Sequence, residues 1–169
     1  MFSDTHCHLA HIASRGVSLD SLFRTMQEDT YRAVVDIGTK PGDLSSRMAV
    51  IADACGGNIP AFIHCTCGIW PDADSIASPD DALIRLEEDI GHMIAVARQR
   101  AESGIPSFAG LGECGLDRFW NGTGKHHDDS VDGPGTDDLA GEEALFCQQI
   151  QLAQKYCLPL IIHSREAYD

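Results

Sequence analysis

Apolar positions along the chain follow two alternating patterns, one typical of buried strands and one typical of amphipathic helices. Helical spacing predicts helices over residues 19–29, 44–54, 79–103 and 139–156. Short, nearly continuous apolar runs predict strands at residues 2–9, 32–39, 59–69, 107–113 and 158–163. Strands that alternate with helices form repeated strand–helix–strand units in which the strands are parallel. We therefore expect an α/β protein whose parallel strands are buried on both faces.

The chain has 169 residues and is 43% hydrophobic, enough for a single domain over residues 1–169. It opens without a basic segment followed by an apolar run, and no apolar stretch is long enough to span a bilayer. The seven cysteines do not show the regular spacing of a disulfide framework or of a thiolate metal site, which favours a reducing compartment. We therefore expect a cytoplasmic protein without a membrane partner. The polar, glycine-rich stretch 121–138 has no apolar period and is expected to be a flexible insertion loop.

Three polar residues alternate near the start of the chain. Side chains two apart on a strand point to the same face, so Asp4, His6 and His8 are expected to project together. Two imidazoles held side by side suit a divalent metal ion. Asp4 could be a further ligand, or could hold a histidine ring in the required tautomer.

Two more metal-ligating side chains end predicted strands, Glu113 the fourth and His163 the fifth. Parallel sheets and barrels place their chemistry where strands end, so these side chains are expected to meet His6 and His8. A carboxylate flanked by imidazoles is typical of a two-metal hydrolytic centre, which activates a water.

Three motifs carry a family resemblance: residues 4–8 (Asp-Thr-His-Cys-His), 112–117 (Gly-Glu-Cys-Gly-Leu-Asp) and 158–165 (Leu-Pro-Leu-Ile-Ile-His-Ser-Arg). They resemble successive signatures of the TatD-family metal-dependent deoxyribonucleases, which are amidohydrolase-like TIM barrels. The likeness runs through nearly the whole chain outside 121–138. It implies a TIM barrel of the (β/α)8 type, of which this chain covers about the first five β/α units.

The resemblance also implies roles for particular residues. His6 and His8 would bind one metal ion, the catalytic Glu113 would bridge two, and His163 would bind the second. The implied reaction is hydrolysis of phosphodiester bonds in DNA by a metal-activated water. The sequence leaves zinc, magnesium, manganese and nickel open. A net charge of −14 argues against an electrostatic grip on nucleic acid, but bound cations can supply local positive charge.

The chain departs from the family pattern in two places. Trp70 stands where the family's Gly-x-His-Pro loop has histidine, and it could stack on a nucleobase or simply pack over the loop. The family's barrel has eight strands, whereas this sequence stops after the fifth predicted one. We expect an incomplete or processed chain of a longer enzyme; a second chain that completes the barrel and an inactive remnant are the alternatives.

Three further residues could support the site or bind the substrate. His64 is either a buried, hydrogen-bonded histidine or a side chain that lines the site. Asp117 lies four residues after Glu113, and Arg165 lies two residues after His163. Arg165 could bind a substrate phosphate, because its planar fork suits such groups, or form an ion pair with Asp117 or Glu166.

Two other functions remain open from the sequence. The same centre could act on an amide or ester, as in an aminoacyl-tRNA deacylase. Alternatively, the chain could be a non-catalytic half-barrel that binds a partner through its open edge.

Overall fold

The computed structural model of the chain describes residues 1–122 and 135–167. Its elements, in chain order, are β1 (Phe2–Cys7), α1 (Leu9–Ser14), α2 (Leu19–Glu28), β2 (Tyr31–Asp36), α3 (Leu44–Ala54), β3 (Ile63–Cys65), α4 (Ala73–Ala77), α5 (Pro79–Glu102), β4 (Leu111–Asp117), α7 (Leu139–Tyr156) and β5 (Leu160–Arg165). The predicted helices are all present, and α3 and α7 have the predicted bounds. The short helices α1 and α4 were not predicted.

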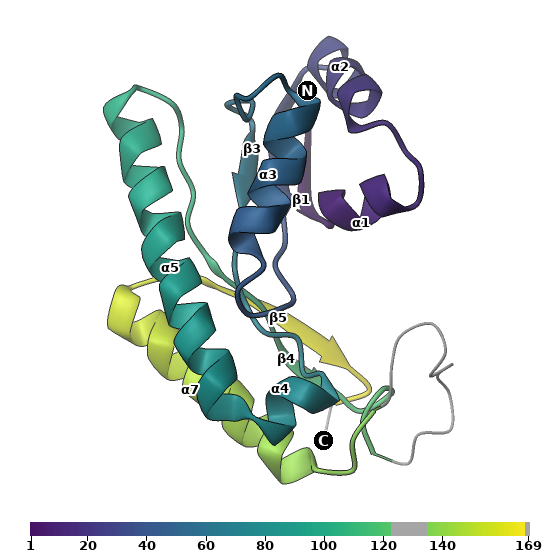
Figure 1. Cartoon of the computed structure of the whole chain (residues 1–169), viewed down its shortest axis with the longest axis vertical. Helices are drawn as coiled ribbons and strands as arrows, with labels where there is room; N and C mark the ends of the chain where they lie inside the picture. Colours follow the sequence, from purple (N-terminus) through teal and green to yellow (C-terminus); the bar gives the residue numbers. More distant parts are fainter. Residues whose placement is uncertain (123–134, 168–169) are drawn as a thin grey trace.

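The strands are parallel and follow one another in chain order (Figure 1). β1, β2 and β3 form one sheet, and β4 and β5 form another. An isolated parallel bridge between Cys67 and Leu111 links the two sheets. The prediction of an α/β fold with parallel strands is therefore confirmed.

The prediction that every strand is buried on both faces is wrong for the two outer strands. β4 and the second half of β2 are buried. In contrast, Phe2 of β1 is 57% exposed and Ile162 of β5 is 60% exposed. The physical reason is position, because among the described residues neither outer strand makes extensive contact with a helix, whereas β4 packs against α7.

The bounds of all five strands differ from the prediction, most of all those of β3, β4 and β5. β3 is much shorter than residues 59–69. Just before it begins, the guanidinium of Arg100 binds the carbonyl oxygens of Pro60 and Ala61. β4 and β5 both begin and end later than predicted. As a consequence, Glu113 and His163 lie inside their strands and not at the ends.

The helices pack against the sheets through two hydrophobic clusters. The larger cluster joins α3, α5 and α7 to the middle of the series of strands β1 to β5. It includes Leu44, Leu86, Ile90, Leu111 and Leu145. The smaller cluster joins α1, α2 and α3 to the first strands and includes Leu9, Phe23, Val34, Ile51 and Ile63. Figure 1 shows the result, with α1 to α3 beside β1 to β3 and α7 beside β4 and β5.

Of the predicted insertion loop 121–138, residues 123–134 lie outside the described residues. Its two ends belong to the folded structure. Asn121 is fully buried, and Asp138 caps α7 by accepting a hydrogen bond from the backbone N of Gly141 at 2.8 Å. Within residues 1–122 and 135–167, no helix is both long enough and apolar enough to cross a membrane.

Candidate metal centre

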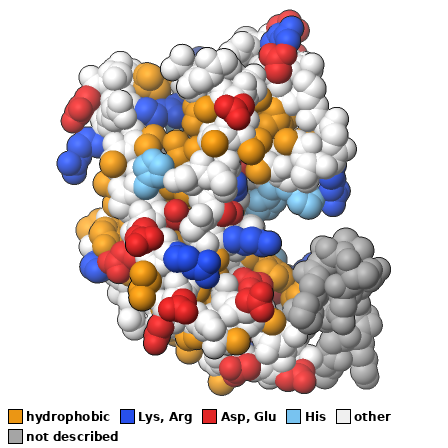
Figure 2. All heavy atoms as spheres, viewed as in Figure 1, with side chains coloured by type: hydrophobic (Ala, Val, Ile, Leu, Met, Phe, Trp, Pro, Cys, Tyr) orange, Lys and Arg blue, Asp and Glu red, His pale blue; other side chains and the backbone are white. Residues whose placement is uncertain are grey.

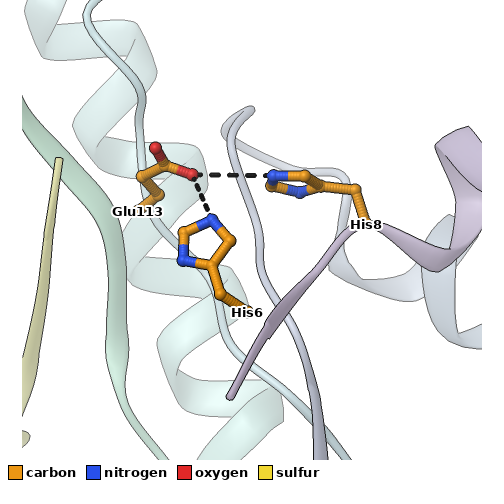
Figure 3. Close-up of side chains that lie close together, drawn as sticks. All are labelled: His6, His8 and Glu113. Carbon is orange, nitrogen blue, oxygen red and sulfur yellow. Dashed lines mark hydrogen bonds and ion pairs between the residues drawn. The ribbon is translucent and has the colours of Figure 1, made fainter. Parts of the chain in front are cut away.

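Three side chains from distant parts of the chain meet at one point: His6, His8 and Glu113 (Figure 3). One ligand atom of each lies within 4.8 Å of the others. His6 belongs to β1 and Glu113 to β4, whereas His8 follows the end of β1 and precedes α1. The sequence placed both histidines inside the strand, which is wrong for His8. Figure 2 shows histidine side chains exposed on a hollowed part of the surface.

One oxygen of Glu113 faces both imidazoles. Its Oε2 lies 3.1 Å from Nε2 of His6 and 3.7 Å from Nε2 of His8. The carboxylate is buried, while the side chains of His6 and His8 are 46% and 39% exposed. The carboxylate of Glu113 therefore lies on the protein side of the centre, and the rings of His6 and His8 lie on its solvent side.

The backbone fixes the tautomer of His8. Its Nδ1 lies 3.0 Å from the carbonyl oxygen of Ile37, which can only accept, so Nδ1 carries the hydrogen. The lone pair on Nε2 is then free and points towards Glu113. A metal-ligating histidine usually donates its other ring N–H in this way, so the residues present fit a bound divalent cation.

Asp4 contacts the backbone of the strand that carries His6. Its Oδ1 accepts a hydrogen bond from the backbone N of His6 at 3.1 Å. Asp4 therefore steadies the strand that carries His6, and the ring-orienting contact comes from the carbonyl of Ile37. The group of three ligand-bearing side chains does not include Asp4.

Glycines allow β4 to place Glu113 so closely against its neighbours. Gly112 has a φ of +147°, and a Cβ there would lie 2.4 Å from the carbonyl oxygen of Ile161. Gly115 has a φ of +150°, and a Cβ there would lie 1.9 Å from the carbonyl oxygen of His163. Both positions demand glycine, which gives a packing reason for the Gly-Glu-Cys-Gly spacing.

His163 contacts the second oxygen of Glu113. Its Nδ1 lies 2.6 Å from Glu113 Oε1, and its Nε2 lies 2.8 Å from Asp117 Oδ2. Burial lowers the pKa of His163, but the hydrogen bonds and charges of Asp117 and Glu113 outweigh it and raise the pKa to about 9. Burial likewise raises the pKa of Glu113, but His163, His6 and His8 bring it below its usual value. In this arrangement both ring nitrogens of His163 donate to carboxylates.

Asp117 is fully buried and joins His163 to Arg165. Nε of Arg165 donates to Asp117 Oδ1 at 3.0 Å, and the guanidinium lies 4.5 Å from the ring centroid of Phe119. Burial raises the pKa of Asp117, but His163 and Arg165 bring it below its usual value. Of the two interpretations of Arg165, this geometry matches the ion pair with Asp117.

The chain matches the protein-family model described as TatD related DNase over residues 3–169. The chain belongs to the TatD family. A similar curated protein is the Bacillus subtilis "Uncharacterized metal-dependent hydrolase YabD", which is 26% identical over 169 residues, 100% of this chain and 52% of that protein. The resemblance seen in the three sequence motifs is therefore confirmed.

The fold of this TatD-family chain also resembles a solved structure. The crystal structure of an uncharacterized amidohydrolase from Saccharomyces cerevisiae matches it with a TM-score of 0.62 at 16% identity, over 98% of this chain and 48% of that chain. The likeness extends to the fold. This TatD-family chain spans about half the length of each of these two relatives.

Two buried ionic groups behind the TatD-family site were not predicted. Asp36 accepts a hydrogen bond from the backbone N of Leu9 at 2.7 Å and is paired with Arg47, so it anchors the turn that carries His8. In the sequence, Asp36 stands out as a charged residue inside an apolar strand. Glu142 accepts from the backbone N of Asp117 at 2.7 Å.

The last two predicted site residues of this TatD-family chain lie in different places. His64 lines a cavity of about 20 Å³ together with Arg100 and Phe108, and the lining residues include none of the three at the metal centre. Burial is the main cause that lowers the pKa of His64. Trp70 lies beside the centre, with its ring centroid 6.1 Å from that of His163.

Proposed function

We propose that this chain supplies the metal-ligating part of a hydrolase that cleaves phosphodiester bonds in DNA. The observation that carries the proposal is the convergence of His6, His8 and Glu113, with Nε2 of His8 held ready by the carbonyl of Ile37. Membership of the TatD family supports the choice of substrate. The name of the Bacillus subtilis relative supports a metal-dependent hydrolysis.

We further propose that the five parallel strands β1 to β5 and their helices form about the first five β/α units of a TIM barrel. The parallel strands in chain order and the fold likeness to the yeast amidohydrolase support this arrangement. The exposed outer strands β1 and β5 are where further strands would pair. These strands would come from the same polypeptide or from a second chain.

The proposed roles follow from the contacts of each side chain. His6, His8 and Glu113 would hold one divalent cation, and Glu113 with His163 would hold a second. When bound, such cations lower the pKa of a water and neutralise charge that develops on the phosphate. His163 can serve only if one ring nitrogen is released from its carboxylate; its bond to Asp117 would then orient the ring. Imidazole ligands favour zinc, manganese or nickel, and phosphate chemistry favours magnesium.

The test is a comparison of substrates on protein stripped with a chelator and reloaded with each of the four metals. We expect reloading to restore cleavage of a DNA oligonucleotide. If reloading restores cleavage of an aminoacyl ester and leaves DNA intact, the nuclease proposal is wrong and the amide or ester alternative takes its place.

A second candidate is a non-catalytic half-barrel that binds a partner. The exposure of β1 and β5, together with the engagement of both nitrogens of His163 by carboxylates, favours it. Sedimentation with metal analysis separates the two candidates. A stable metal-free complex with a partner supports the half-barrel, and a monomer that holds two metal ions rules it out.

A further inference from the structure

Beside the metal centre, a tryptophan is fixed in place by parts of the chain that are distant in sequence. The backbone N of Trp70 donates to the carbonyl oxygen of Thr39 at 2.9 Å. The backbone N of the preceding residue, Ile69, donates to Oε1 of Gln149 at 2.9 Å. The carbonyl oxygen of Ile69 accepts from Nε2 of Gln149 at 3.0 Å. The following residue, Pro71, accepts a hydrogen bond from Asn121 at 2.9 Å. Residues 69–71 are therefore held from three directions.

Trp70 is the least buried of residues 69–71. Ile69 is fully buried and anchors the loop, whereas Trp70 is half-buried. Its ring meets Trp120 at a centroid distance of 5.7 Å and an interplanar angle of 68°, and it meets His163 at 6.1 Å and 76°. Both contacts are near perpendicular, and no parallel stack on Trp70 is found among the described residues. A rigid, partly open aromatic ring thus lies next to a side chain of the site.

We propose that Trp70 is a stacking platform for an unpaired nucleobase adjacent to the phosphodiester bond that is cleaved. This proposal rests on the proposed function, because it assumes a nucleic-acid substrate at the Glu113 centre. Aromatic rings bind bases through their faces, which a base exposes only when it is unpaired. The net charge of −14 gives the chain little electrostatic attraction for phosphates, so base stacking is a suitable source of binding free energy.

Fluorescence gives a readout that does not depend on activity. The sequence contains two tryptophans, so Trp120→Phe leaves Trp70 as the sole indole. The probe is a short oligothymidylate with phosphorothioate linkages, which resist cleavage, in the presence of Mg²⁺ or Mn²⁺. We expect saturable quenching of Trp70 by this probe and little quenching by an abasic oligonucleotide of the same length or by a blunt duplex. Equal quenching by the abasic probe, or none by oligothymidylate, overturns the proposal.

Kinetic measurements provide a second test of the role of Trp70. Trp70→Ala should lower kcat/KM for single-stranded DNA by about tenfold more than for a base-free phosphodiester, while Trp70→Phe should retain most of that preference, because a smaller ring still stacks. The matched control is Phe108→Ala, which truncates a partly exposed ring beside His64, away from the metal centre. It should not change the ratio of the two rates. An equal fall on both substrates in Trp70→Ala overturns the platform.

The outcomes separate this proposal from the one it rests on. If no reloaded metal gives DNA cleavage but Trp70 is quenched by oligothymidylate and not by the abasic probe, the nuclease function fails and base stacking stands. If DNA is cleaved and Trp70→Ala leaves the preference for single strands as it was, the nuclease function stands and the platform fails.

Discussion

His8 donates its Nδ1–H to the carbonyl oxygen of Ile37 over 3.0 Å, and this contact leaves Nε2 as the only ring atom that can bind a cation. Nε2 in turn lies 3.7 Å from Oε2 of Glu113. The ring is therefore oriented before any ion arrives, which reduces the entropy lost when the ion binds. Because the acceptor is a backbone atom, its role is not encoded in the identity of residue 37.

Metal binding should stabilise the folded chain, because His6, His8 and Glu113 meet only in the folded state. Zinc or manganese at a hundredfold excess over its Kd should raise Tm by about 5 °C or more. His6→Ala and His8→Ala should reduce this shift sharply, whereas His11→Ala, at an exposed position of α1, should not. Thermal unfolding with measurement of bound metal provides the check. A full shift in His8→Ala would contradict the proposed ligand set.

Removing the charge of Glu113 should abolish the proposed activity. Glu113→Gln keeps the shape of the side chain but weakens the ligand that faces both histidines, so DNA hydrolysis should fall by about 100-fold or more. The control is Glu143→Gln, whose side chain is 62% exposed and binds Arg118. Initial rates under saturating metal give the comparison, and a Glu113→Gln protein that keeps the wild-type rate would exclude this carboxylate as a ligand.

The buried pair of Asp36 and Arg47 should be important for stability. Asp36→Ala leaves the buried guanidinium without one partner and the backbone N of Leu9 without its acceptor, at a cost of about 3–5 kcal/mol in the free energy of unfolding. The pair of Asp20 and Arg24 lies exposed on α2, so Asp20→Ala should have no measurable effect. Urea unfolding of both variants is the measurement. Equal midpoints would mean that Asp36 is not an anchor.

Gly115 should tolerate no side chain. In Gly115→Ala the new Cβ would lie 1.9 Å from the carbonyl oxygen of His163, at a φ that disfavours alanine, so we expect a loss of at least about 2 kcal/mol. Gly91→Ala in α5 is the matched change, because nothing lies within 4 Å of its Cβ. It should stabilise the protein by about 0.5–1 kcal/mol. In denaturant unfolding, the midpoint should therefore fall for Gly115→Ala and rise for Gly91→Ala.

The elements that were predicted well are those specified by local pattern. α3 and α7 begin and end at the predicted residues, since their apolar spacing and the glycines or polar residues at their ends lie within the segments themselves. The short helices α1 and α4 were missed, because five or six residues carry too little periodicity to be recognised. The predicted strand 59–69 was too long at both ends. Before β3 begins, Arg100, far along the chain, binds the carbonyls of Pro60 and Ala61, a contact that no local pattern indicates.

The sequence by itself determined the order of helices and strands, the parallel α/β class and the residues that could ligate a metal, because these depend on spacing and side-chain chemistry within short segments. Only the tertiary structure decided that His6 meets Glu113, 107 positions away, that Ile37 orients His8, and that Asp117 and Glu113 share His163 between them. These contacts depend on how strands from distant segments align. That alignment is fixed by the packing of the whole fold and not by any one stretch of residues.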